Sequence, residues 1–282
     1  MKILTHAPEL QATLQELRNR GKRIGFVPTM GYLHEGHQEL MKQARKDNDV
    51  VVLSIFVNPL QFGENEDFDK YPRDMDRDTA LAESCGVDYI FFPTVQEMYG
   101  DGISVKVKVE KRTNVMCGKS RPGHFDGVAT VLTKLFNIVM PHKAYFGLKD
   151  AQQVAVVEGL VKDFNFPIEI VRVPIIREED GLAKSSRNLY LLESERNEAK
   201  ELYASLALAD KLIAQGERDP QVIKEAVRGH ILGNTSASID YIEIYSYPEL
   251  EEVRRLKGEI IIAVAAVFAS ARLIDNIIIK LR

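Results

Sequence analysis

The fold of this chain is decided by residues 24–37, which read Ile24-Gly-Phe-Val-Pro-Thr-Met-Gly-Tyr-Leu-His-Glu-Gly-His37. An apolar run ends at Val27, a glycine-containing turn follows, and an amphipathic segment comes next. This order predicts a buried strand, a loop and the start of a helix. Because the first backbone N–H groups of a helix have no partner within it, the turn is a candidate anion site with phosphate as the natural ligand. His34 and His37 are three positions apart and therefore project from about the same face.

The strand-and-helix pattern continues through the first half of the chain. The run Val50–Val57 is too continuously apolar for a strand with a solvated face, so we predict a second buried strand. A strand, a helix and a strand within about 35 residues form a βαβ unit with a right-handed crossover. The further predicted elements are helices over 7–20, 35–47, Asp74–Ser84, Val128–Met140 and Asp150–Phe164, strands over Asp88–Phe92, Ala144–Gly147 and Ile168–Val173, and an edge strand over Ile103–Val109. The predicted fold class is α/β, a Rossmann-like doubly wound parallel sheet.

The pattern changes after a polar connector, Pro174–Arg187. Two helices and then three consecutive strands follow, which is typical of a small α+β domain. The predicted helices cover Ser194–Gln215 and Pro220–Leu232, and the predicted strands cover Ile239–Tyr245, Glu259–Phe268 and Arg272–Ile279. We therefore expect two domains, a catalytic domain over 1–176 and a smaller lid domain over 177–282.

Composition excludes several classes of protein. The 282 residues are 45% hydrophobic and 28% charged, and no run approaches the ~20 apolar residues of a membrane span. A net charge of −4 argues against a broad nucleic-acid surface and confines any phosphate chemistry to a cleft. The chain starts without the apolar core of a signal peptide, so we expect a cytoplasmic protein with neither a membrane nor a nucleic acid as partner.

Two motifs carry candidate chemistry. The pair His34 and His37 does not fit the zinc-binding helix pattern, which needs histidines four apart, although one packed and one solvated histidine remains an alternative. Gly36 between them would let a phosphate approach the backbone. The second motif, Gly181–Asn188, places two cations and two hydroxyls on one loop, as in a clamp on a triphosphate; the alternative is a polar linker.

The two motifs together resemble the HIGH and KMSKS signatures of the nucleotidyltransferase superfamily. Over most of the chain, the sequence resembles the pantoate–β-alanine ligase (pantothenate synthetase) family. The resemblance also rests on Phe56–Phe62, Asp67–Arg73, Arg121–Gly127, Thr133–Ile138, Tyr145–Gln153 and Ala271–Asn276.

The resemblance implies that ATP and pantoate form pantoyl adenylate and pyrophosphate with Mg²⁺, after which β-alanine attacks to give pantothenate and AMP. It also implies a homodimer that contacts through the larger domain. The implied ATP-binding residues are Met30, Gly31, Tyr32, Leu33, His34, Glu35, Gly36, His37, Gly147, Leu148, Lys149, Asp150, Ile176, Lys184, Ser185, Ser186 and Arg187. The implied catalytic residues are His37 as proton donor, with His34, Lys149, Ser185 and Arg187.

The remaining substrates have candidate residues as well. Gln61 and Gln153 are expected to hold pantoate and β-alanine, because a neutral amide donates to a carboxylate without neutralising it. Asp76 and Asp78 are candidates for Mg²⁺ through water, with a solvated helix face as the alternative. Arg121 and His124 are further candidate substrate contacts.

Two positions depart from the family pattern, which usually has Glu or Gln at position 148 and Met at position 184. Leu148 gives no support to a side-chain role there, and we hypothesise that Lys184 adds phosphate affinity. An alternative function is a nucleotidylyltransferase of the same superfamily, which would use the same turn but would not explain Gln61 and Gln153. An RNA-binding module is disfavoured by the net charge of −4.

Overall fold

The computed structural model describes residues 1–63, 66 and 68–281. The chain separates into two compact units. The larger contains Met1–Thr113 and Cys117–Pro174, and the smaller contains Asn114–Met116 and Ile175–Arg282. Each unit has its own sheet and its own apolar core, so each is described by itself.

The larger unit is built on a six-stranded sheet of order β1-β4-β3-β2-β5-β6, in which every pairing is parallel. Its strands are β1 (Lys2–Leu4), β2 (Ile24–Thr29), β3 (Val50–Ile55), β4 (Tyr89–Phe91), β5 (Lys143–Gly147) and β6 (Glu169–Val173). From β2 the chain proceeds to β3 and β4 on one side and returns to β5 on the other. The sheet is therefore doubly wound with its switch point between β2 and β5, which confirms the predicted fold class.

The switch point opens toward the carboxyl ends of the strands. Pairing of β2 with β5 involves only Gly25 with Lys143 and Phe26 with Ala144, whereas β2 stays paired with β3 up to Thr29. The separation of β2 from β5 beyond Phe26 leaves the crevice in which open α/β sheets bind their ligands.

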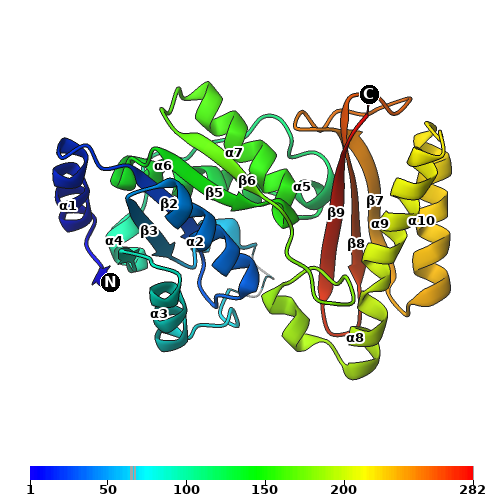
Figure 1. Cartoon of the computed structure of the whole chain (residues 1–282), viewed down its shortest axis with the longest axis horizontal. Helices are drawn as coiled ribbons and strands as arrows, with labels where there is room; N and C mark the ends of the chain where they lie inside the picture. Colours follow the sequence, from blue (N-terminus) through cyan, green and yellow to red (C-terminus); the bar gives the residue numbers. More distant parts are fainter. Residues whose placement is uncertain (64–65, 67, 282) are drawn as a thin grey trace. The chain divides into compact units, whose positions relative to one another are not determined.

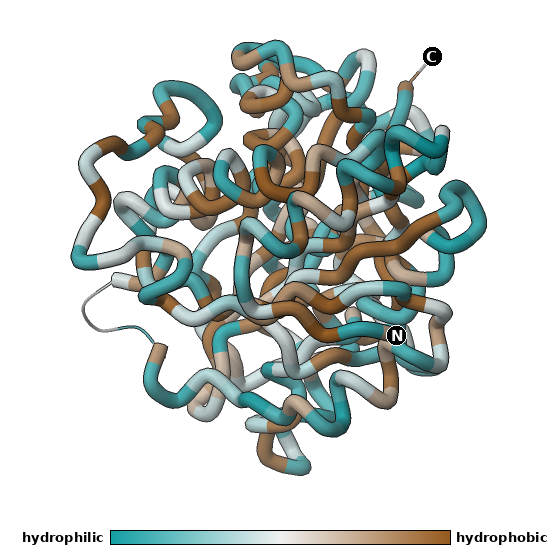
Figure 2. The backbone as a smooth tube through the Cα atoms, turned by 90° about the vertical axis from the view of Figure 1, so that its left-hand side faces the viewer, coloured by the Kyte–Doolittle hydropathy of each residue, from teal (hydrophilic) through white to brown (hydrophobic). Residues whose placement is uncertain are grey.

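Helices cover both faces of this sheet (Figure 1). The helices that precede the smaller unit are α1 (Ala7–Asn19), α2 (Glu35–Asp47), α3 (Met75–Ser84), α4 (Val95–Tyr99), α5 (Met116–Ser120), α6 (His124–Val139) and α7 (Ala151–Asp163), with the 3₁₀ turns η1 (Pro59–Gln61) and η2 (Leu148–Asp150). Of these, α5 begins at the boundary between the units. Successive side chains of a strand point to opposite faces, so Phe26 joins the core beneath α1, α6 and α7 while Val27 joins the core beneath α2 and α3. Figure 2 colours the backbone by hydropathy, and its brown stretches are the apolar segments of the chain.

The smaller unit packs two helices on an antiparallel sheet of order β7-β8-β9. Its elements are η3 (Ser186–Tyr190), α8 (Glu193–Ala199), α9 (Glu201–Ala214), α10 (Pro220–Asn234), β7 (Ser238–Ser246), β8 (Glu259–Val267) and β9 (Arg272–Lys280). The predicted α+β character of this part is confirmed.

Several element predictions were wrong or missing, among them the short helices α4 and α5, which were not predicted. The predicted edge strand over Ile103–Val109 is not a strand, because Val107 and Val109 donate their N–H groups to side chains of α6 instead of to a neighbouring strand. The single helix over Ser194–Gln215 is two, α8 and α9, interrupted at Lys200. Strand β1 was missed because three residues are too few to show a periodic pattern.

Candidate active site

The turn after β2 is held by a carboxylate from another helix. Asp78 of α3 accepts hydrogen bonds from the backbone N–H groups of Tyr32 and Leu33, both at 2.7 Å. Gly31 and Tyr32 have φ values of +88° and +50°, a region that glycine tolerates best. A Cβ on Gly31 would lie 2.9 Å from Ile55 Cγ2 and 3.0 Å from Asp78 Oδ2. The turn therefore needs both glycine and Asp78.

Asp78 does not lie on a solvated helix face, which was the alternative for this residue. It is 1% exposed, and burial raises its pKa despite the two N–H donors. Asp76, by contrast, is exposed. Of the two residues, only Asp76 is solvent-exposed, as the alternative of a solvated helix face expects.

His34 and His37 lie side by side with defined proton positions. Their ring centroids are 4.1 Å apart. His34 Nδ1 accepts from Gly36 N at 3.1 Å, and His37 Nδ1 accepts from His34 N at 3.2 Å. A backbone N–H can only donate, so each Nδ1 is bare and each neutral ring carries its proton on Nε2. Both rings therefore offer an Nε2–H donor at the N-terminus of α2.

The charge state of His37 follows from its surroundings. Burial, then the neighbouring His34, then the positive charge of Lys149, lower the pKa of His37 well below its usual value. The ring is therefore neutral at pH 7 and acts as a hydrogen-bond donor without a net charge. Lys149 lies in η2, directly after β5, so the two turns at the switch point act on the same ring.

Gln61 reaches the same turn from the end of β3. It is 9% exposed, and its Nε2 donates to Met30 Sδ at 3.2 Å. Its backbone carbonyl accepts from His124 Nδ1 at 2.8 Å and from Arg121 Nη2 at 3.3 Å. Arg121 is also paired with Glu66. Arg121 and His124 thus both donate to the backbone carbonyl of Gln61.

His124 has the opposite tautomer to the pair in the turn. A carbonyl only accepts, so His124 carries its proton on Nδ1, and its Nε2 accepts from Arg121 Nη1 at 3.2 Å. Burial, with the charge of Arg121, lowers the pKa of His124 to about 4. Gln61 and His124 line a polar pocket of about 200 Å³ that also contains Lys106.

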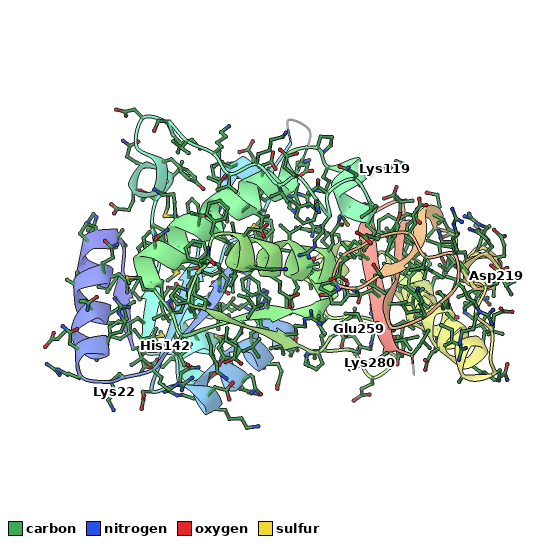
Figure 3. The ribbon with its side chains drawn as sticks, turned by 90° about the horizontal axis from the view of Figure 1, so that it is seen from above. Lys22, Lys119, His142, Asp219, Glu259 and Lys280 are labelled. Carbon is green, nitrogen blue, oxygen red and sulfur yellow. The ribbon has the colours of Figure 1, made fainter. Side chains whose placement is uncertain are left out.

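The other predicted residues of this unit lie at the carboxyl ends of the strands. Gly147 ends β5, and Leu148, Lys149 and Asp150 form η2. Leu148 packs against the core, which suits an apolar side chain at a position where the family usually has a polar one. Gln153 is half-buried on the first turn of α7. His142 instead contacts Ile24 at the opposite, amino end of β2 and takes no part (Figure 3).

In the smaller unit, the second motif forms a hairpin. Lys184 N donates to Ile176 O at 2.9 Å, and Arg177 pairs with Ala183 in an isolated bridge. Lys184 Nζ forms an ion pair with Glu178 at 2.7 Å. Ser185 caps η3, which contains Ser186 and Arg187, by accepting from Arg187 N.

The base of this hairpin is held by an ion pair between Arg177 and Asp275, which the sequence analysis did not predict. Arg177 donates to both carboxylate oxygens of Asp275, at 2.7 and 2.9 Å, and lies over the ring of Tyr203. Asp275 is within the motif Ala271–Asn276, so the resemblance marked the residue but not its partner.

Comparison with known proteins assigns these features to a family. A family model described as pantoate-beta-alanine ligase matches residues 2–278. The chain belongs to this family. It is 61% identical over 277 residues to the pantothenate synthetase of Geobacillus sp. (strain WCH70), covering 98% of each chain. It is also 57% identical over 282 residues to that of Bacillus cereus (strain G9842), covering 100% of each.

Solved structures of pantoate-beta-alanine ligases share the fold. Pantothenate synthetase from Thermus thermophilus has a TM-score of 0.93 at 44% identity, over 98% of this chain and 99% of that one. A ligase from Francisella tularensis, complexed with beta-gamma ATP and beta-alanine, has a TM-score of 0.79 at 34% identity, over 98% and 97%. The expected ligase family is thus confirmed, and the nucleotidylyltransferase alternative is not supported.

Neither a metal cage nor a membrane span is found in the described part of this ligase. Among residues 1–63, 66 and 68–281, there is no group of three or more His, Cys, Asp or Glu side chains arranged to hold a metal ion. Both oxygens of Asp78 are already bonded to backbone N–H groups. The described side chains therefore provide no cage of three or more such ligands for a metal ion. No helix in those residues is long and apolar enough to cross a membrane.

Proposed function

We propose that this chain activates pantoate with ATP and joins it to β-alanine at the carboxyl ends of β2, β3 and β5. A carboxylate oxygen of pantoate attacks the α-phosphorus, and the bond to the β-phosphate breaks to release pyrophosphate. The amine of β-alanine then attacks the acyl carbon, loses a proton, and AMP leaves. Both steps need alignment and stabilisation of charge on phosphate oxygens more than covalent help from the protein.

The observation that carries this proposal is the pair of Nε2–H donors on His34 and His37 beside the N-terminus of α2. Neutral donors and backbone N–H groups stabilise charge that develops on phosphate oxygens without having to reorganise. Lys149 adds a positive charge that acts on the His37 ring. His37, which the family resemblance marks as the proton donor, is proposed to act by donating a hydrogen bond from Nε2–H, because its lowered pKa leaves the ring neutral near pH 7.

The remaining ATP assignments are supported by family membership and stay proposals. Met30–His37 and Gly147–Asp150 would bind ATP from the larger unit, and Ile176 with Lys184–Arg187 from the smaller one. The larger unit would then act as the catalytic domain, predicted as residues 1–176, and the smaller unit as the predicted lid, 177–282; the unit boundary between Pro174 and Ile175 places Ile176 in the smaller unit. The ATP and β-alanine named for the Francisella tularensis ligase support these two substrates here.

Pantoate is assigned to Gln61 and Gln153. The Gln61 amide directs its Nε2–H at Met30, which lies in the turn between β2 and α2. That donor suits a carboxylate awaiting attack on ATP, because it binds the anion without neutralising the nucleophile. Gln153 lies at the start of the helix that follows β5, the strand across the switch point.

The ion, the assembly and the location also stay proposals. Mg²⁺ would be held chiefly by ATP phosphates and its own waters, with the exposed Asp76 as the better placed of the two carboxylates. A homodimer through the larger unit stays a proposal that rests on the family resemblance. A cytoplasmic location remains as predicted.

The proposal is tested by ATP–pyrophosphate exchange with and without pantoate. We expect exchange only with pantoate, and full turnover with β-alanine to give pantothenate and AMP in equal amounts. Exchange that ignores pantoate would overturn the first step, and a nucleotide-linked product would restore the nucleotidylyltransferase alternative.

A further inference from the structure

A chain of buried hydrogen bonds leads from Tyr99 to Gln61. Tyr99, the last residue of α4, donates its hydroxyl to Asn58 Oδ1 at 2.7 Å. Asn58 Nδ2 donates to Gln61 Oε1 at 3.1 Å, and Gln61 Nε2 donates to Met30 Sδ. Tyr99 and Asn58 are 8% and 1% exposed, so water has little access with which to replace these bonds.

The polarity of this chain is fixed at Asn58. Its Oδ1 also accepts from Leu60 N at 3.2 Å, and its Nδ2 also donates to Gly127 O at 3.1 Å. A backbone N–H only donates and a backbone carbonyl only accepts, so the Asn58 amide has one allowed orientation. Burial raises the pKa of Tyr99, so its hydroxyl keeps the proton that it donates.

The orientation of Gln61 follows from that of Asn58. Because Asn58 presents a donor to Gln61, the Gln61 amide must turn its oxygen toward Asn58 and its Nε2–H groups toward Met30. The reversed amide would place two donors against each other inside the protein, where an unmet donor costs about 1–3 kcal/mol in general. Gln61 therefore presents a hydrogen-bond donor to the turn between β2 and α2.

We propose that Tyr99 is a positioning residue for pantoate, which holds Asn58 so that the Gln61 amide presents Nε2–H to the substrate carboxylate. Tyr99 itself does not contact the substrate. It acts through the side-chain amides of Asn58 and Gln61. The ring centroids of Tyr99 and Phe56 are 6.0 Å apart, and Phe56 precedes Asn58 by two residues. This inference rests on the proposed assignment of pantoate to Gln61.

The test compares Tyr99→Phe with Tyr145→Phe. Tyr145 is a matched control, because its buried hydroxyl also bonds to an asparagine, Asn48 at 2.7 Å, and to Asp47, away from Gln61. We expect Tyr99→Phe to raise the KM for pantoate about 5-fold, the effect of one lost hydrogen bond, with the KM for ATP changed less than about 2-fold. Tyr145→Phe should change neither constant by more than about 2-fold.

A second variant retains the hydroxyl of Tyr99. Asn58→Asp keeps the shape of the side chain but removes the donor to Gln61, so the Gln61 amide must reverse to satisfy the new oxygen. We expect its KM for pantoate to rise about 10-fold or more, since a charged acceptor then competes for Nε2–H.

Gln61→Ala separates failure of the inference from failure of the function. If Gln61→Ala raises the KM for pantoate but Tyr99→Phe does not, the positioning role is wrong and the pantoate assignment stands. If Tyr99→Phe raises the constants for ATP and pantoate equally, the hydroxyl is merely structural and the inference is overturned. If Gln61→Ala leaves the KM for pantoate unchanged, the assignment of Gln61 fails and the inference fails with it.

Discussion

The Oδ1 atom of Asp78 accepts a hydrogen bond from the backbone N–H of Leu33 at 2.7 Å, although the two residues are 45 positions apart. Its other oxygen binds the preceding N–H of the same turn. The loop that presents His34 and His37 is thus held from α3, a helix on a different βαβ unit. Removing this carboxylate should disturb the histidines without touching them.

Asp78→Asn tests this relationship. The substitution places an NH₂ group against one of the two backbone N–H donors, so we expect a loss of about 1–3 kcal/mol in the free energy of unfolding. The loop should also shift, and misplacement near 1 Å costs up to about 100-fold in rate. Denaturant unfolding and kcat/KM for ATP measure both effects.

Asp76→Asn is the matched control, because Asp76 lies on the first turn of the same helix and is exposed. Its stability should change by no more than about 0.5 kcal/mol, as for surface substitutions in general. If Asp76 meets Mg²⁺ through water, the Mg²⁺ concentration for half-maximal rate should rise in this variant. Equal losses of stability in the two variants would contradict the anchoring role of Asp78.

The tautomer of His37 predicts which substitution it tolerates. A glutamine amide can place an N–H near the position of Nε2, whereas an asparagine amide reaches only the position of Nδ1. We therefore expect His37→Gln to retain more kcat than His37→Asn, and the latter to lose about 100- to 1,000-fold, as when one donor to a developing oxyanion is removed. The rate of ATP–pyrophosphate exchange with pantoate measures the step concerned. Equal rates for both variants would argue against donation from Nε2.

Stability should fall in mild acid because of two histidines. The pKa values of His37 and His124 are lowered in the folded protein, that of His124 to about 4. Below about pH 6.5 the unfolded chain takes up protons at these rings, while the folded protein does not. The folded state therefore loses stability as the pH falls from about 6.5 to about 4, by up to about 3 kcal/mol for His124 alone.

Denaturant unfolding between pH 7.5 and pH 4 measures this loss. His124→Asn keeps a donor near the position of Nδ1 for the Gln61 carbonyl but cannot titrate, so it should flatten the slope over this range. A slope that is unchanged in His124→Asn would place the acid sensitivity elsewhere.

Local patterns predicted the fold well, and the site only in part. The pairing of His34 with His37 and the position of the turn follow from helical spacing and apolar runs, which are local properties of the sequence. The roles of Asp78 and Tyr99 depend on which helix packs beside which loop, and no spacing in the sequence records that. The segment Ile103–Val109 shows the converse case, because its alternation wrongly predicted a strand, whereas Val107 and Val109 donate to side chains of a helix.

The ion pair of Lys184 bears on the hypothesis that this residue adds phosphate affinity. Its ammonium group is 2.7 Å from Glu178 across the hairpin, and both side chains are partly exposed. A phosphate that binds Lys184 must compete with this carboxylate or share the ammonium group with it. The added phosphate affinity that we hypothesised is therefore reduced by Glu178, and the two residues should have opposite effects on ATP binding.

Glu178→Gln should accordingly lower the KM for ATP, and Lys184→Met should raise it and weaken its dependence on salt, because one exposed charge interaction with the phosphates is lost. Arg196→Gln is a useful control, since Arg196 makes a comparable ion pair with Asp180 in the same hairpin. The double variant of Glu178 and Lys184 shows whether the two effects are coupled. If Glu178→Gln has no effect once Lys184 is Met, the carboxylate acts through the ammonium group; if Lys184→Met leaves both the KM for ATP and its salt dependence unchanged, Lys184 serves only to close the hairpin.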